Sequence, residues 1–191
     1  MNTNFQGTVI GKSGRRAFGF FRVPSWLISG LLGLLLLAAC GGSDTAKNAP
    51  VKSAEDRFAI KVGDRTVSMQ IAALPAELQK GLMFRKTMGE DEGMLFVFTL
   101  GQPQGFWMRN TTLPLDIGYF EPDGELKEIY PMYPHDERPV KSRSRHIQFC
   151  LEMNQGWFAR NGVKPGAKLD LKAVAAALKA RGLKPETAGL R

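Results

Sequence analysis

The sequence predicts a mainly β protein, organised as a compact antiparallel β-sandwich or barrel-like single domain with one or two short helices. Three observations support this fold class: several short stretches alternate apolar and polar residues, turn signals separate them, and the helical segments between them are brief. The chain contains neither an internal repeat nor the regular strand–helix alternation of a parallel α/β fold. We therefore expect one domain built mainly from neighbouring strands.

The folded part is expected to begin with a hairpin. Residues 58–62 and 67–71 alternate with a period of two, and Gly63-Asp64 between them is a turn signal. A short helix is expected over 75–82, because Pro75 suits the first turn of a helix and good helix formers follow it.

The remaining elements follow the same reasoning. Further strands are expected at 94–98, 106–108, 115–120, 126–130 and 146–153, with the first of these buried on both faces. A long polar loop is expected over 131–144, and residues 168–171 could close the sheet. An alanine-rich stretch at 174–179 predicts a terminal helix.

The N-terminal region indicates export and lipid anchoring. Four basic residues and no acidic residue precede an apolar run that ends in Leu37-Ala38-Ala39-Cys40, and this tetrapeptide resembles the bacterial lipobox. The resemblance implies a signal peptide over 1–39 and lipid attachment at Cys40. The apolar run is shorter than the roughly 20 residues that a spanning helix needs, although a transmembrane anchor remains the alternative. Arg15-Arg16 resembles part of a twin-arginine signal, so the export route stays open.

The expected location and the mature charge narrow the possible functions. Gly41 after the cysteine favours the periplasmic face of the outer membrane, by resemblance to sorting rules in double-membrane bacteria. Residues 40–56 are polar and predict a flexible tether. Of 26 Lys and Arg, four lie before Cys40, which leaves 22 against 18 Asp and Glu, a net charge of +4. This modest charge argues against a nucleic-acid partner. Cys150 has no second cysteine for an intrachain disulfide.

A set of ordered motifs in the domain resembles a known family. The motifs are Gly-Leu-Met-Phe-Arg at 81–85, Gly-Met-Leu-Phe-Val-Phe at 93–98, Phe-Trp-Met-Arg-Asn-Thr at 106–111, Pro-Leu-Asp-Ile at 114–117, Leu-Glu-Met at 151–153 and Gly-Val-Lys-Pro-Gly at 162–166. Together they resemble domain of unknown function 192, also called uncharacterised protein family 0127. The resemblance covers about 57–171 and implies a compact mainly β domain without an established activity. Residues 172–191 are expected to form a helix and tail beyond it.

The polar residues of these motifs are the candidate ligand-binding set, and none is assigned as catalytic. The set comprises Arg85, Trp107, Arg109, Asn110, Thr111, Asp116 and Glu152. Buried charges need partners, so Arg85 could pair with Asp116 or Glu152, and the set could simply satisfy itself and fix strand register. Alternatively, these side chains converge in a pocket floored by Trp107 that receives a small polar or anionic ligand.

Two other functions remain as alternatives. Asp116 and Glu152 could act as acid and base in a hydrolase of envelope polymer. The methionines, with Cys150 and His146, could bind Cu(I), although methionine in apolar runs usually fills a core. A zinc site of ordinary spacing is absent from the sequence, and we expect no cofactor. The oligomeric state is left open.

Overall fold

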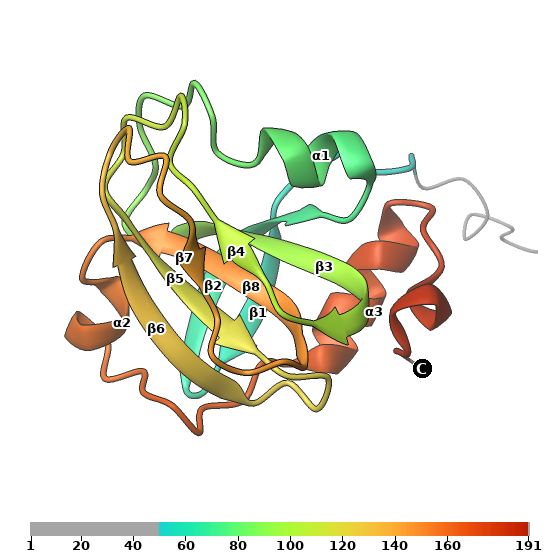
Figure 1. Ribbon diagram of the computed structural model, residues 1–191. Coiled ribbons are helices and arrows are strands. Elements are labelled where there is room, and N and C mark those ends of the chain that lie inside the picture. The colour runs from blue at the N-terminus through green and yellow to red at the C-terminus, as the bar shows by residue number, and fades with distance from the viewer. Residues whose placement is uncertain (1–49, 191) are drawn as a thin grey trace, which may run out of the picture. The chain divides into compact units, whose positions relative to one another are not determined.

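The computed structural model describes residues 50–190, and the domain is built around one curved six-stranded sheet (Figure 1). The strands are β1 (Phe58–Val62), β2 (Arg65–Ala72), β3 (Glu92–Gln102), β8 (Ile147–Asn154), β5 (Leu115–Phe120) and β6 (Leu126–Met132), in that spatial order. Two very short strands, β4 (Gly105–Phe106) and β7 (Val140–Lys141), form a separate ribbon. The mainly β fold predicted from the sequence is therefore confirmed.

One pair of strands departs from the expected antiparallel arrangement. Strands β2 and β3 run parallel, with Ser68 opposite Glu92, whereas the other pairs in the sheet are antiparallel. The long connection over 73–91 makes this possible, because it contains helix α1 (Pro75–Lys80) and returns the chain to the same end of the sheet. Alternating patterns predict strands but carry no information about the direction of their neighbours.

The sheet closes at one end, as expected for residues 168–171. Leu169 forms an isolated bridge with Val62 on β1, and Lys168 forms one with Glu125, just before β6. The backbone of 166–170 thus hydrogen-bonds to both edges of the sheet. Because these edges would otherwise be unpaired, this segment gives the sheet its barrel-like form.

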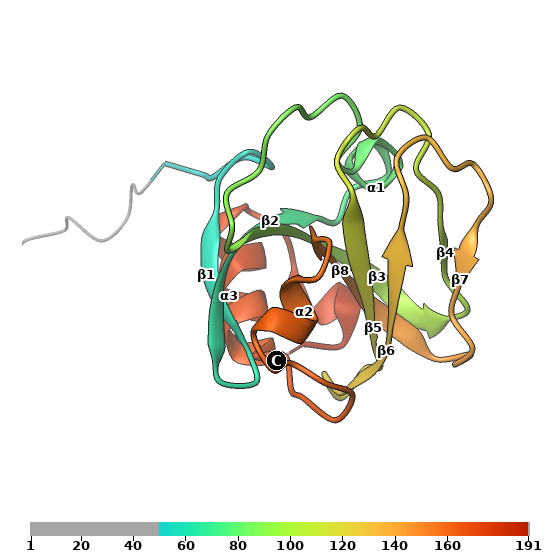
Figure 2. The same cartoon turned by 90° about the vertical axis from the view of Figure 1, so that its left-hand side faces the viewer.

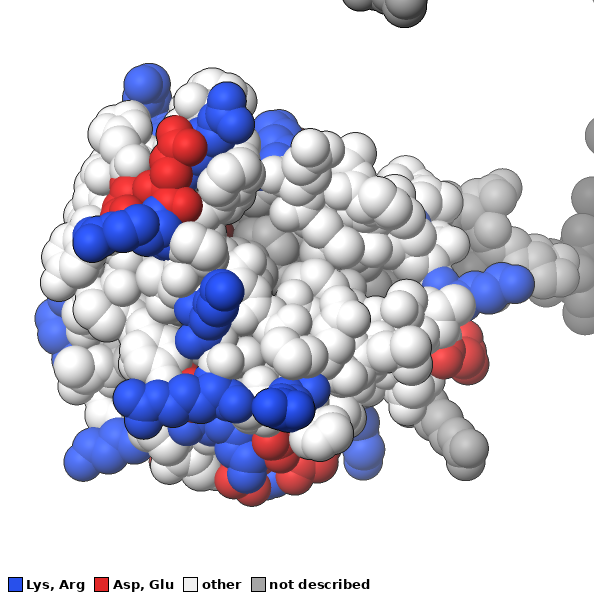
Figure 3. Space-filling model, viewed as in Figure 1, with Lys and Arg blue, Asp and Glu red and all other residues white. Residues whose placement is uncertain are grey.

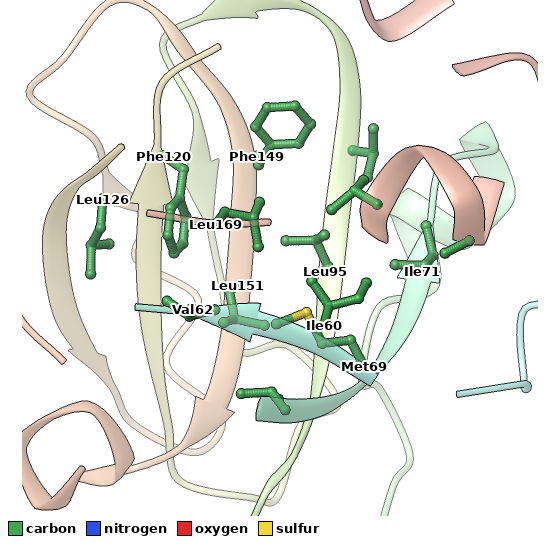
Figure 4. Close-up of a cluster of buried hydrophobic side chains, with 14 of the residues drawn as sticks. Ile60, Val62, Met69, Ile71, Leu95, Phe120, Leu126, Phe149, Leu151 and Leu169 are labelled. Carbon is green, nitrogen blue, oxygen red and sulfur yellow. The ribbon is translucent and has the colours of Figure 1, made fainter. Parts of the chain in front are cut away.

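Different elements pack against the two faces of the sheet (Figure 2). Helices α2 (Trp157–Arg160) and α3 (Leu171–Ala180) lie between β1 and β6 and bury a large cluster that includes Leu95, Phe149 and Leu151 (Figure 4). Helix α1 and the β4–β7 ribbon cover the opposite face, over a second cluster that includes Phe96 and Tyr119. A final 3-10 helix spans Pro185–Ala188. A hydrophobic core cluster therefore lies on each face of the sheet.

Several local expectations change in the structure. The strand predicted at 106–108 ends at Phe106, because the backbone N–H of Met108 donates to the carbonyl of Asp136 in a loop. The predicted loop over 131–144 contains β7. The last residues of the predicted tether contact the domain, since the Lys52 N–H donates to the Ala180 carbonyl at 2.9 Å.

The signal peptide over 1–39, Cys40 and most of the tether lie outside the described residues. Within residues 50–190, each helix is too short or too polar to cross a membrane.

Candidate functional site

Residues of four family-like motifs, those at 81–85, 93–98, 106–111 and 151–153, line two neighbouring cavities on the face of the sheet covered by α1 and the β4–β7 ribbon. The first, which we call the Glu152 cavity, encloses about 200 Å³. Its walls come from α1, the loop after it, β3, the segment around β4, and β8, and its lining includes Lys80, Met83, Gln104, Trp107, Thr111 and Glu152. The second, which we call the Arg85 cavity, encloses about 400 Å³ and shares Lys80, Gly81 and Met83 with the first.

Glu152 is the buried acidic group of its cavity. It lies on β8, opposite Met94 on β3 and Ile117 on β5, so its side chain belongs to the face with the smaller core cluster. Only 5% of the residue is exposed. Burial raises the pKa of Glu152 to about 8, because the charged carboxylate loses its hydration. Among residues 50–190, no group donates a hydrogen bond to this carboxyl, and desolvation accounts for its raised pKa.

Gln104 also lines this cavity, and its side chain has an unpartnered polar group. Its backbone is held by a hydrogen bond to Ser142 Oγ at 3.1 Å, just before β4. The side-chain Nε2 is buried and has no hydrogen-bond partner within the described part of the chain. A buried amide nitrogen without an acceptor is costly, so this group favours a bound acceptor.

Trp107 lies between the buried floor and solvent. Its side chain lines the Glu152 cavity, yet the residue is 46% exposed. The Arg109 guanidinium lies over the indole ring, 5.7 Å from the ring centroid. Trp107 thus offers an exposed aromatic surface beside a polar cavity, and Arg109 supports this surface from outside without lining the cavity.

Residues 109–111 form a turn that joins two loops. Asn110 has a left-handed backbone with φ of +56°, and its carbonyl accepts a hydrogen bond from the Phe84 N–H at 2.8 Å. Thr111 is buried, lines the Glu152 cavity, and donates through Oγ1 to the Arg109 carbonyl at 3.3 Å. Asn110 itself is exposed and lines neither cavity. Of this predicted trio, only Thr111 reaches the cavity, and Asn110 acts by fixing the loops.

Arg85 lies in the other cavity, and its predicted pairing with Asp116 or Glu152 is wrong. Its guanidinium donates to Gln70 Oε1 at 2.5 Å and lies 3.9 Å from the Glu55 carboxylate. Glu55 belongs to the segment before β1, which the motif pattern did not include. The structure therefore moves this arginine away from the acidic residues of the motifs.

Asp116 is also separated from Glu152. It lies opposite Met153 on β8, whereas Glu152 lies opposite Ile117, so the two carboxyl groups project from opposite faces of the sheet. Asp116 Oδ2 accepts a hydrogen bond from the Gly156 N–H at 2.7 Å, at the start of α2. Desolvation raises the pKa of Asp116, and this bond together with Arg160 partly opposes the shift. Asp116 therefore has a structural partner, and the two acids do not form an acid–base pair.

The methionines are dispersed. Met69 and Met153 lie in the larger core cluster, Met108 and Met132 in the smaller one, and Met83 and Met94 line the Arg85 cavity. Burial raises the pKa of the Cys150 thiol well above its usual range. Within residues 50–190, no three His, Cys, Asp or Glu side chains gather as a metal-binding group.

Sequence reasoning missed Gln70 and Gln104 as site residues. For Gln70 a sequence signal existed, because this polar residue interrupts the apolar stretch 69–72; in the structure it is only 1% exposed. Gln104 lies in an ordinary polar loop and carried no comparable signal.

Fold and cavities together define a small mainly β protein with a ligand-sized, partly polar cavity beside an exposed tryptophan. A family model described as DUF192, Uncharacterized ACR, COG1430, matches residues 58–171, and the chain belongs to this family. The match confirms the family resemblance of the motifs.

Solved structures and curated proteins add little about activity. A protein of unknown function from Novosphingobium aromaticivorans DSM 12444 is 35% identical, with a TM-score of 0.57, over 60% of this chain and 84% of that one. A protein from Sinorhizobium meliloti 1021, described as a "putative transcription regulator (R01717)", is 34% identical, with a TM-score of 0.56, over 60% of this chain and 92% of that one. No curated protein matches the chain.

Proposed function

We propose that the protein is a lipid-anchored cell-envelope protein whose β domain binds a small polar ligand in the Glu152 cavity without catalysing a reaction on it. The observation that supports this most strongly is that Glu152 and Gln104 line one cavity, where the Glu152 carboxyl is desolvated and the Gln104 Nε2 has no hydrogen-bond partner within residues 50–190. Buried polar groups are normally satisfied, and each exception needs an explanation. A ligand that completes both hydrogen bonds provides one.

The protonation state of Glu152 narrows the ligand class. With a pKa of about 8, this carboxyl is mainly protonated near pH 7 and can donate a hydrogen bond. The Gln104 Nε2 group is also a donor. Two donors in one cavity favour a neutral ligand with carbonyl or hydroxyl oxygens. Neither Arg85 nor Arg109 lines this cavity, and the ammonium group of Lys80, which does line it, lies 3.5 Å from the Glu55 carboxylate; we therefore do not propose an anionic ligand for it.

Trp107 would contribute the apolar part of recognition. An exposed indole at a cavity presents a flat, rigid surface on which a ring or an amide plane can pack at small entropic cost. The surface viewed in Figure 3 is mostly uncharged, with a row of basic side chains along its lower left and a mixed group of acidic and basic side chains at its upper left.

A binding experiment with small probes tests the proposal. Acetamide and N-acetylglucosamine carry the oxygen acceptors that the cavity needs, and Trp107 fluorescence reports their entry. We expect both probes to shift the emission and to reduce quenching of Trp107 by iodide. The substitution Gln104→Leu should weaken binding by about tenfold, as expected for one lost hydrogen bond in a buried site. The matched change Gln102→Leu, at an exposed position outside this cavity, should leave it unchanged. Equal affinities for the two variants would contradict the proposal.

The anchor is proposed from the lipobox alone. We propose that Cys40 carries the acyl chains that hold the protein at the periplasmic face of the outer membrane, because two or more chains bind a bilayer firmly. Cys40→Ser should release the protein from the membrane fraction and abolish incorporation of radioactive palmitate. Cys150→Ser is the matched control, since Cys150 is the other cysteine and is buried in the domain. Persistence of both signals in Cys40→Ser would refute the lipid anchor.

A further inference from the structure

The Arg85 cavity has at its edge a set of donors that converge on one carboxylate. Gln70 Nε2 donates to Glu55 Oε2 at 2.9 Å, Lys80 Nζ lies 3.5 Å from Glu55 Oε1, and the Arg85 guanidinium lies 3.9 Å from Glu55 Oε2. The three donors come from β2, the end of α1 and the following loop. Elements far apart in the fold therefore direct nitrogen donors at a single anionic group.

These donors are built into the domain. Gln70 is only 1% exposed, and its Oε1 accepts a hydrogen bond from Arg85 at 2.5 Å. Because the amide oxygen is engaged by Arg85, the amide nitrogen is turned toward residues 54 and 55, where it also donates to the backbone carbonyls of Ala54 and Glu55 at 3.3 Å. The side chain of Arg85 is itself mostly buried, with 20% of it exposed. The Gln70–Arg85 pair is thus a preformed donor group.

The carboxylate they hold belongs to a different part of the chain. Glu55 lies before β1, outside the family match over 58–171, and 68% of its side chain is exposed. The Gln70 hydrogen bond, assisted by Lys80 and Arg85, lowers the pKa of Glu55, so this group is ionised at neutral pH. Exposed ion pairs contribute little to stability, so a carboxylate from solution can compete with Glu55.

The cavity beside these donors is largely apolar, and the carboxylate of Glu77, which also lines it, is paired with Arg181. Its volume of about 400 Å³ is twice that of the Glu152 cavity, and the side chains that line it include Ile71, Ala72, Ala76, Met83, Phe84 and Met94. Phe84 is 67% exposed and has a left-handed backbone with φ of +64°, which is rare for an aromatic residue. A strained, exposed aromatic residue at the lining of an apolar cavity is typical of a binding surface.

We propose that Gln70, Lys80 and Arg85 form a carboxylate-binding site for an aliphatic carboxylate, whose hydrocarbon part enters the Arg85 cavity, and that Glu55 occupies this site in cis when the ligand is absent. This site differs from the Glu152 cavity and requires a ligand of different charge. The segment before β1 then acts as a weak internal competitor, whose effective concentration is high because it is attached to the domain.

Calorimetry on the intact protein with hexanoate, and with 1-hexanol as a probe with the same chain but no carboxylate, tests the site. We expect hexanoate to bind more tightly than 1-hexanol. Glu55→Ala should tighten hexanoate binding by about tenfold, since the competitor is gone. Glu137→Ala, at an exposed glutamate of the 133–138 loop, is the matched control and should not change it. Equal binding of the two probes, or no difference between the two variants, would overturn the proposal.

Two further measurements separate loss of the site from loss of the fold. Lys80→Ala changes an exposed side chain, should leave thermal unfolding unchanged, and should weaken hexanoate binding by at least about threefold. Hexanoate should also speed amide hydrogen exchange at residues 53–57, because displacement of Glu55 frees this segment. Exchange that is unchanged at saturating hexanoate would show that Glu55 does not occupy the ligand's position.

Discussion

The buried carboxyl of Glu152 should make the stability of this protein depend on pH in a way that one substitution removes. In the folded protein its pKa is about 8, against an ordinary value of 4.5. Between these two values the folded state keeps a proton that the unfolded state has lost. Raising the pH in this range therefore favours the unfolded state.

The size of the effect follows from the width of this range. Each pH unit between the two pKa values costs about 1.4 kcal/mol of unfolding free energy. From about pH 5 to about pH 7.5, Glu152 alone should therefore lower the stability by roughly 3 kcal/mol. Above pH 8 the loss levels off, because both states are then ionised. The neighbouring Tyr119 and Cys150 have raised pKa values and stay neutral throughout this range.

Glu152→Gln keeps the shape of the side chain and removes its titration. Urea unfolding of wild type and variant, measured in parallel from about pH 5 to about pH 7.5, isolates Glu152, since the other titrating groups cancel in the difference. We expect the variant to gain roughly 3 kcal/mol relative to wild type over that range. Glu137→Gln, at an exposed site, controls for the loss of one charge. Parallel pH profiles for wild type and Glu152→Gln would refute the reasoning about this buried acid.

Three other substitutions or treatments test the packing of the domain. Gly93→Ala should destabilise the fold by about 1–3 kcal/mol in urea unfolding, because the new Cβ would lie 2.6 Å from the backbone carbonyl oxygen of Glu152. An unchanged free energy of unfolding would contradict the close approach of β3 and β8 at this position. Arg181→Met should cost about 3 kcal/mol in the same assay, since it leaves the Glu77 carboxylate without its buried partner. The comparison is Lys179→Met, at an exposed position. In the Cys40→Ser protein, Cys150 should react with a thiol reagent only after unfolding, and its rapid labelling in the native state would contradict its burial and raised pKa.

The cost of burying Glu152 in terms of stability favours a functional role for this residue. A carboxyl without partners lowers stability at neutral pH, whereas an apolar residue of similar size at this position on β8 would not. Proteins commonly accept such a cost at functional sites. Asp116 has a different, structural role. Its carboxylate accepts a hydrogen bond from the Gly156 N–H at the start of α2.

Local elements were predictable from the sequence wherever side-chain periodicity reports burial directly. The hairpin of β1 and β2, the doubly buried run at 94–98, and the strand at 115–120 follow from alternation, apolar runs and turn residues. Motif order was also sufficient to indicate the family over residues 58–171. These signals are local, since each depends on residues within a few positions of one another.

Only the tertiary structure decided which of the predicted residues meet. Arg85 was expected near acidic residues of the motifs, but the parallel pairing of β2 with β3 and the long connection through α1 bring it to Gln70 and Glu55. Asp116 and Glu152 were candidates for one site, yet the pairing register places them on opposite faces of the sheet. Strand direction and register depend on contacts between distant segments, and a single sequence does not encode them in any local pattern. The sequence by itself thus determined the class of fold and the family, and the lipid anchor stays a prediction, whereas the assembly of the sheet determined the two cavities.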